Sequence, residues 1–123
     1  MYTLCVSWKS AYKAAFFLWI ALIGVLSVVP APNSAVTVSD KLAHFVSYFV
    51  TALLCYCAFR KEKFSFIIAS GIAVFLYGIA IEFVQYFLPY RDFSLGDIAA
   101  NASGIGSFIL IWVVYSRVLR HGS

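Results

Sequence analysis

Four long apolar runs divide the chain, and the short stretches between them contain charged residues or proline. The hydrocarbon core of a membrane is about 30 Å thick, so about 20 consecutive apolar residues in a helix can cross it. Helices are expected because backbone groups in lipid must satisfy one another, and a chain this short without alternating polarity cannot close a barrel. The pattern predicts an all-α integral membrane bundle of four transmembrane helices, at about residues 12–29, 41–59, 64–88 and 95–116.

The composition supports this prediction. The chain has 123 residues, of which 63% are hydrophobic and 11% are charged. Soluble domains average about half apolar and about a quarter charged residues, so a water-soluble globular fold is excluded. Four spans of about 20 residues use most of the chain. We therefore expect residues 1–123 to form a single transmembrane domain, with any chemistry inside the bundle.

The first apolar run has a second interpretation as a cleaved signal peptide. It is short, Lys9 and Lys13 precede it, and small residues flank Pro30. These are features of secretory signals, although the run is slightly longer than the apolar part of most signal peptides. We expect an uncleaved helix, and cleavage stays open as the alternative.

Basic residues are distributed unequally around the predicted helices. Seven of the nine lie before the first helix, in the second connection or after the last helix: Lys9, Lys13, Arg60, Lys61, Lys63, Arg117 and Arg120. Because positive charge is retained on the cytoplasmic side, both termini are expected there, and residues 31–42 and 89–97 are expected to face outward. Topology and contact with anionic lipids explain the net charge of +4, so membrane lipids are the expected partners and nucleic acid is not. The oligomeric state stays open.

The remaining polar residues gather at the two outward-facing ends. Asp40, His44 and Tyr48 follow one another at intervals of four, so they share one helical face, with Lys41 beside the first of them. An acid in the first helical turn has a routine explanation, because it interacts favourably with the helix dipole. His44 lies one turn deeper, and ionisable residues within spans are uncommon and face the bundle interior. His44 is therefore a candidate functional residue.

The third predicted helix carries a carboxylate inside the membrane. Glu82 and Gln85 are three residues apart and share a face, and Glu82 lies about 9 Å inside the predicted helix end. A carboxyl group at that depth needs a partner. It could stay neutral, pair with Lys41 or Arg91, or hold a metal ion or a proton under transfer.

A third polar group begins the fourth predicted helix. Ser94 and Asp97 have the spacing of a helix cap, which supplies a routine explanation for the acid. Asn101 follows Asp97 by four residues, and Gly104 lies near the same side, so this face permits close approach of another helix. Arg91 precedes the group and is suited to bidentate binding of a phosphate or carboxylate, although snorkelling to the interface also explains it.

Three ordered blocks of residues resemble the VanZ-like family. They are Asp40-Lys41-x-x-His44-Phe45-x-x-Tyr48, Gly78-x-x-x-Glu82-x-x-Gln85-x-x-x-Pro89-x-Arg91, and Ser94-x-x-Asp97-x-x-x-Asn101-x-x-Gly104. The resemblance covers about residues 30–112. It implies a small multi-helix protein of the bacterial cytoplasmic (inner) membrane and cell envelope. It also implies a link to teicoplanin resistance, as in the founding member, and a distant relation to enzymes that exchange or modify lipid head groups.

The resemblance marks the positions that the polarity argument also reaches: Asp40, His44, Glu82, Gln85, Arg91, Asp97 and Asn101. We expect His44 to be the general base or nucleophile and Asp40 or Asp97 to orient it, because an imidazole can move protons near neutral pH. The expected substrate-binding residues are Arg91, Gln85, Asn101, Glu82, Lys41 and Tyr48. A divalent cation held by Asp40, Glu82 and Asp97 is an open alternative.

These residues favour a membrane protein that acts on a phosphate-linked lipid head group, on a phospholipid or a polyprenyl carrier, as a transferase or hydrolase. Whether it turns over its ligand stays open. The first alternative is a non-catalytic binding protein for cell-wall lipid precursors or glycopeptide antibiotics. The second is a small proton-coupled exporter with Glu82 as its proton carrier, which one-sided basic charge disfavours.

Overall fold

The computed structural model describes residues 2–30, 38–61 and 63–122; side chains are described from Trp8 onward in the first helix and from Asp40 onward in the second. It contains four helices: α1 (Tyr2–Val28), α2 (Val38–Phe59), α3 (Phe64–Tyr86) and α4 (Leu95–His121). All four are long and apolar enough to cross a membrane, and the described residues include no strand. The prediction of an all-α membrane bundle is confirmed.

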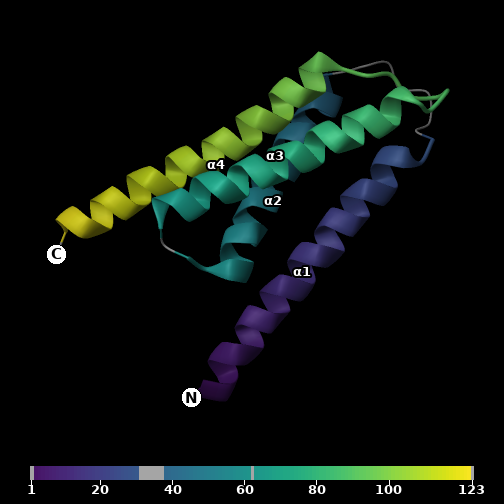
Figure 1. Cartoon of the computed structure of the whole chain (residues 1–123). Helices are drawn as coiled ribbons and strands as arrows, with labels where there is room; N and C mark the ends of the chain where they lie inside the picture. The colour runs from purple at the N-terminus through teal and green to yellow at the C-terminus, as the bar shows by residue number, and fades with distance from the viewer. Residues whose placement is uncertain (1, 31–37, 62, 123) are drawn as a thin grey trace.

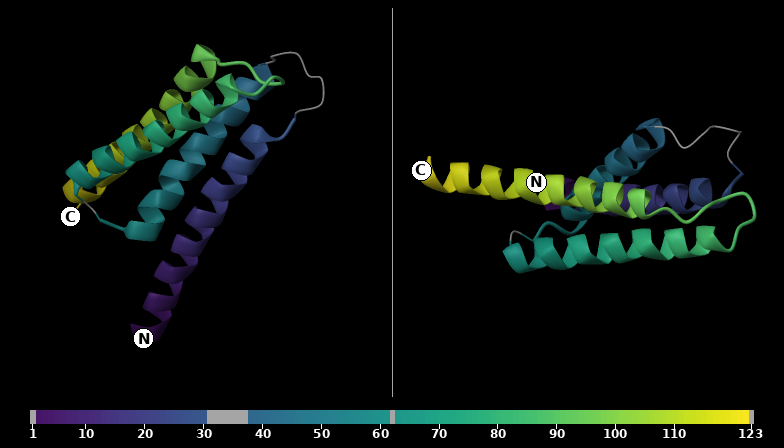
Figure 2. Two further views of the ribbon diagram at one scale, coloured as in Figure 1. Left: turned by 45° about the vertical axis from the view of Figure 1, so that its right-hand side comes forward. Right: turned by 90° about the horizontal axis from the view of Figure 1, so that it is seen from above.

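The helix α2 occupies the centre of the bundle. It packs against the other three helices, most extensively against α4, and Figures 1 and 2 show α1 and the α3/α4 pair on different sides of it. The two chain termini and the α2–α3 connection lie at one end of the bundle, which we call the terminal end (Figure 1). The opposite end, which carries the connection between α3 and α4, is called the α3–α4 end.

The helix bounds differ from the predicted ones for identifiable reasons. The first helix begins at Tyr2 rather than near residue 12, and α4 continues to His121 rather than 116, because flanking charges end an apolar run without ending a helix. The second helix begins at Val38, slightly before the predicted residue 41. The third ends at Tyr86 rather than 88, since the residue before Pro89 is disfavoured in the α conformation.

Two glycines set how closely the helices approach near the α3–α4 end. A Cβ atom at Gly104 would overlap the carbonyl oxygen of Phe45 in α2, so α4 and α2 are in backbone contact there. A Cβ atom at Gly78 would lie 2.9 Å from the Tyr48 ring, so this glycine leaves the room that the tyrosine fills between α2 and α3. Small residues thus bring three helices together around Tyr48.

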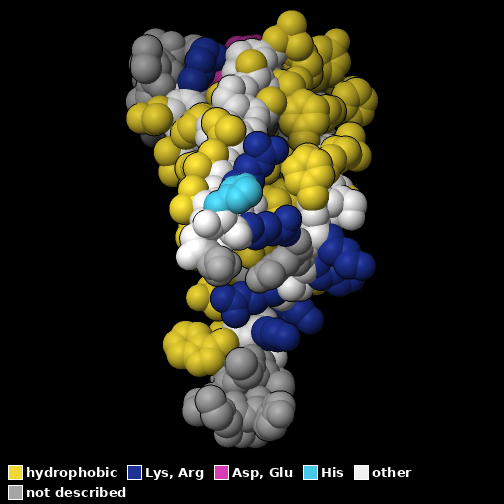
Figure 3. Space-filling view, turned by 90° about the vertical axis from the view of Figure 1, so that its left-hand side faces the viewer, with side chains coloured by type: hydrophobic (Ala, Val, Ile, Leu, Met, Phe, Trp, Pro, Cys, Tyr) yellow, Lys and Arg dark blue, Asp and Glu magenta, His cyan; other side chains and the backbone are white. Residues whose placement is uncertain are grey.

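Charge is segregated along the bundle. The acidic residues whose side chains are described all lie toward the α3–α4 end: Asp40, Glu82, Asp92 and Asp97. Lys and Arg side chains gather on the surface of the terminal end (Figure 3). The α3–α4 end therefore holds the described carboxylates, and the candidate site lies there.

Candidate functional site

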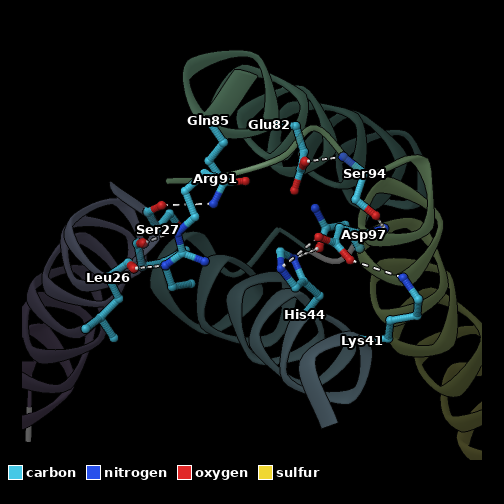
Figure 4. Close-up of polar contacts among 11 residues, drawn as sticks. Leu26, Ser27, Lys41, His44, Glu82, Gln85, Arg91, Ser94 and Asp97 are labelled. Carbon is cyan, nitrogen blue, oxygen red and sulfur yellow. Dashed lines mark hydrogen bonds and ion pairs between the residues drawn. The ribbon is translucent and has the colours of Figure 1, made fainter. Parts of the chain in front are cut away.

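His44 stands at the centre of a polar cluster between α2 and α4 (Figure 4). Its Nδ1 atom lies 3.0 Å from Oδ1 of Asn101, and its Nε2 atom lies 3.6 Å from Oδ2 of Asp97. An amide oxygen accepts a hydrogen bond, so Nδ1 carries the proton in this pair. Nε2 is then the ring nitrogen that faces the carboxylate of Asp97.

Asp97 is held in place by its position at the start of α4. Ser94 caps this helix, since its Oγ accepts a hydrogen bond from the backbone N–H of Asp97 at 3.3 Å. The other carboxylate oxygen of Asp97 lies 3.4 Å from Nζ of Lys41. The buried carboxylate therefore lies between a lysine, whose side chain is 44% exposed, and the imidazole of His44.

Glu82 faces the same cluster from α3. Its side chain has no exposed surface, and its Oε2 accepts a hydrogen bond from the backbone N–H of Ser94 at 3.3 Å. Its Oε1 is buried and has no hydrogen-bond partner among the described residues. The carboxyl group is close enough to interact electrostatically with Asp97 and His44. Glu82 thus fixes the start of α4 and leaves one oxygen directed into the bundle.

A cavity of about 210 Å³ opens beside His44. Its walls come from α1, α2, the end of α3 and the α3–α4 connection, and its lining residues are Ile23, Leu26, Ser27, Asp40, Ala43, His44, Ser47, Tyr48, Gln85 and Arg91. Two of these have buried donor atoms without a partner among the described residues, Oη of Tyr48 and Nε of Arg91. A buried polar atom without a partner is costly, so these two atoms indicate a place for a polar ligand.

Side chains from α3 and the α3–α4 connection hold α1 against this cavity. Gln85 donates from Nε2 to the carbonyl oxygen of Ser27 at 2.9 Å. Arg91 donates from Nη2 to the carbonyl oxygens of Leu26 and Val29, at 3.2 and 3.0 Å. The last carbonyl groups of a helix have no partner within it, so these side chains complete the end of α1. Gln85 and Arg91 therefore build a wall of the cavity as well as lining it.

The structure divides the nine predicted site residues into two groups. Five line the cavity: Asp40, His44, Tyr48, Gln85 and Arg91. The other four contact His44, Asp97 or the start of α4: Lys41, Glu82, Asp97 and Asn101.

The contribution of α1 to the cavity was not predicted from the sequence, whereas Ser47, which also lines the cavity, shares the helical face of Asp40 and His44 by its spacing. Ser27 offered a weak signal, as a polar residue near the end of an apolar run. Ile23 and Leu26 offered none, because an apolar residue in a span gives no indication of whether it faces lipid or a cavity.

Two of the three carboxylates that the sequence offered as possible cation ligands, Asp40 and Asp97, lie close to His44. Ligand atoms of Asp40, His44 and Asp97 lie within 4.8 Å of one another, whereas Glu82 is bonded to the backbone of Ser94 instead. Mg²⁺ and Ca²⁺ prefer oxygen ligands, and the ammonium group of Lys41 already lies 3.4 Å from Asp97. We therefore assign no metal to this donor set.

Comparisons with known proteins agree with the residue pattern. The sequence model of the VanZ/LLP1 family matches residues 3–117. The chain is also similar to the curated "Uncharacterized protein C11E3.10" of Schizosaccharomyces pombe (strain 972 / ATCC 24843). The two are 35% identical over 91 residues, which are 71% of this chain and 54% of the relative, so the chain spans about half the length of that relative. No solved structure matches the chain.

Proposed function

Because the chain belongs to the VanZ/LLP1 family, we propose that it transfers or hydrolyses a phosphate-linked lipid head group in the cavity beside His44. The observation that carries this proposal is one combination of groups. An imidazole held by Asn101 and Asp97 lies in the wall of a cavity that also contains the unpartnered donors of Tyr48 and Arg91. A base beside donors suited to an anion is what phosphoryl chemistry requires.

The one-sided basic charge supports an orientation for this site. Seven of nine basic residues lie near the termini or in the α2–α3 connection, and such an excess marks the cytoplasmic side. The terminal end is then cytoplasmic, and the cavity at the α3–α4 end opens toward the outer leaflet. The proposal takes the chain to be a multi-pass protein of the inner membrane in a bacterium.

The residues in and around the cavity suit distinct parts of the reaction. Nε of Arg91 and the hydroxyl of Tyr48 donate hydrogen bonds to the phosphate oxygens that carry charge. Nε2 of His44 takes a proton from the attacking water or alcohol, whose oxygen then bonds to phosphorus. The bond from phosphorus to the departing oxygen breaks, and the imidazolium returns the proton to that oxygen. Asp97 stabilises the imidazolium between these two transfers.

The size of the cavity favours a head group over a whole glycopeptide. Sites for drug-sized ligands occupy about 300–1,000 Å³, whereas this cavity measures about 210 Å³. That volume suits a phosphate and its immediate substituents, with the lipid tail outside the cavity.

The proposal is tested by comparing His44→Gln with the wild-type chain on phospholipids and polyprenyl phosphates labelled in the head group. The purified full chain, reconstituted in vesicles, is assayed for release or exchange of the label and separately for retention of the labelled lipid. His121→Gln is the matched control, because this histidine lies in the last turn of α4 at the terminal end. We expect His44→Gln to lose turnover by at least 100-fold while retaining the lipid, since general-base catalysis contributes about 10²–10⁴-fold.

Other outcomes would replace the proposal. Lipid retention without turnover in the wild type would support a binding protein, including one that withholds cell-wall precursors from teicoplanin. Turnover that is equal in the wild type and His44→Gln would remove His44 from the chemistry. Transport of a drug into vesicles that depends on Glu82 and on a proton gradient would support an exporter.

A further inference from the structure

A second cavity lies at the terminal end, remote from the site described above. It has a volume of about 150 Å³, lies between α2 and α4, and is lined by Tyr56, Trp112, Tyr115, Ser116, Leu119 and Arg120. The polar cluster around His44 lies at the opposite end of the same two helices. Any ligand of this second cavity is therefore bound apart from the head-group site.

The inner wall of this cavity is formed by packed aromatic rings. Trp112 is only 9% exposed, and its ring meets that of Tyr56 edge to face, with centroids 6.3 Å apart. Phe108 also packs against Tyr56, with ring centroids 6.1 Å apart. These rings belong to the core between α2 and α4, so the wall exists before any ligand arrives.

The cavity changes from apolar to cationic along α4. Trp112 and Arg120 are eight residues apart, which is about 12 Å along a helix. The interfacial region of one leaflet is about 5–8 Å thick, so this distance reaches from the head groups to the first carbons of the acyl chains. Arg120 lies in the last turn of α4, where its guanidinium matches the geometry of a phosphate group.

The surroundings select an anion. Lys and Arg side chains gather on the surface of the terminal end (Figure 3), and the acidic side chains that the structure describes lie toward the other end of the bundle. We propose that this cavity binds one anionic phospholipid of the adjacent leaflet, with its phosphate at Arg120 and its upper acyl chain against Trp112.

General attraction between a basic surface and anionic lipids predicts that the exposed arginines contribute equally to lipid binding. Such attraction treats all basic residues near the membrane surface alike. Arg117 lies on the same helix one turn before Arg120, and it is also exposed, but it does not line the cavity. The two arginines thus form a matched pair that separates a defined site from diffuse attraction.

The test titrates the purified, delipidated full chain in mild detergent with phosphatidylglycerol and counts bound lipids by native mass spectrometry. We expect Arg120→Gln to weaken binding of the first lipid about tenfold or more, the size of a lost charge-assisted hydrogen bond. Arg117→Gln should weaken it less than about twofold. Phosphatidylcholine should bind the wild type more weakly than phosphatidylglycerol does, and this preference should disappear in Arg120→Gln.

A second measurement places the acyl chain and does not depend on the arginine variants. Phosphatidylglycerol with brominated acyl chains should quench a fraction of the tryptophan fluorescence that is absent in Trp112→Phe. Equal weakening by the two arginine variants would reduce the site to diffuse attraction and overturn the proposal. Displacement of the lipid by millimolar inorganic phosphate would show a site for phosphate alone, and quenching unchanged in Trp112→Phe would place the lipid elsewhere.

Discussion

A methyl group at position 104 should drive apart the two helices that carry the His44 cluster. In Gly104→Ala the new Cβ would overlap the carbonyl oxygen of Phe45 and lie 3.0 Å from the backbone nitrogen of Phe49. Both are backbone atoms, so no side chain can rotate to relieve the contact and α2 must move away from α4. Overpacking of this kind costs about 1–3 kcal/mol. We expect the free energy of unfolding to fall by that amount.

The same displacement of α2 should also weaken the hydrogen bond that holds His44. His44 precedes Phe45 in the chain, and its Nδ1 lies 3.0 Å from Oδ1 of Asn101 across the α2–α4 contact. A separation of about 1 Å would lengthen this pair beyond hydrogen-bond range. Gly104→Ala should therefore lower head-group turnover as well as stability.

Gly106→Ala is the matched control, because a Cβ atom at Gly106 would meet nothing within 4 Å. Alanine is favoured over glycine within a helix by up to about 1 kcal/mol, so this variant should be as stable as the wild type or more stable. Both variants are unfolded with increasing SDS in mixed micelles, and helix content is followed by circular dichroism. If Gly104→Ala proves as stable as Gly106→Ala, the backbone contact between α2 and α4 is refuted.

Two further substitutions test how α1 is attached. Trp19→Phe removes a hydrogen bond of 3.0 Å to a hydroxyl of α2 and should lower the free energy of unfolding by about 0.5–1 kcal/mol; Trp8→Phe, at an exposed position, should not. Tyr90→Phe removes a hydrogen bond of 2.6 Å to the carbonyl oxygen of Val28 and should speed amide hydrogen exchange in the last turns of α1, with Tyr86→Phe as the control. Unchanged exchange in Tyr90→Phe would mean that this bond does not hold the helix end.

The membrane fold was predictable because a bilayer imposes simple rules on a sequence. A fixed hydrocarbon thickness sets the length of each apolar run, and charged residues mark where each run ends. The same rules do not determine where a helix stops. The residues from Tyr2 onward and those up to His121 are helical beyond the apolar runs, since a helix can continue into water.

The polar cluster could be anticipated in part from helical spacing. Asp97 and Asn101 are four residues apart on a face of small residues, which placed them against another helix, and the structure brings them to His44. The partner of Glu82 could not be anticipated, because it is a backbone N–H group in the α3–α4 connection. Sequence patterns show side-chain types and give little indication of free backbone groups.

The role of α1 could not be anticipated either, because it depends on free backbone carbonyl groups at the end of that helix. Arg91 donates hydrogen bonds from Nη2 to the carbonyl oxygens of Leu26 and Val29. Its Nε is buried in the cavity wall without a partner among the described residues. One planar guanidinium can serve both purposes because its donors point in several fixed directions, whereas a lysine would supply a single charged point. In the proposed function, the position of α1 and the binding of the phosphate are therefore coupled through one side chain. The helix α1 has no described ionisable group near the cavity. It nevertheless forms part of the site, because its free carbonyl groups accept hydrogen bonds from the same arginine that would bind a phosphate.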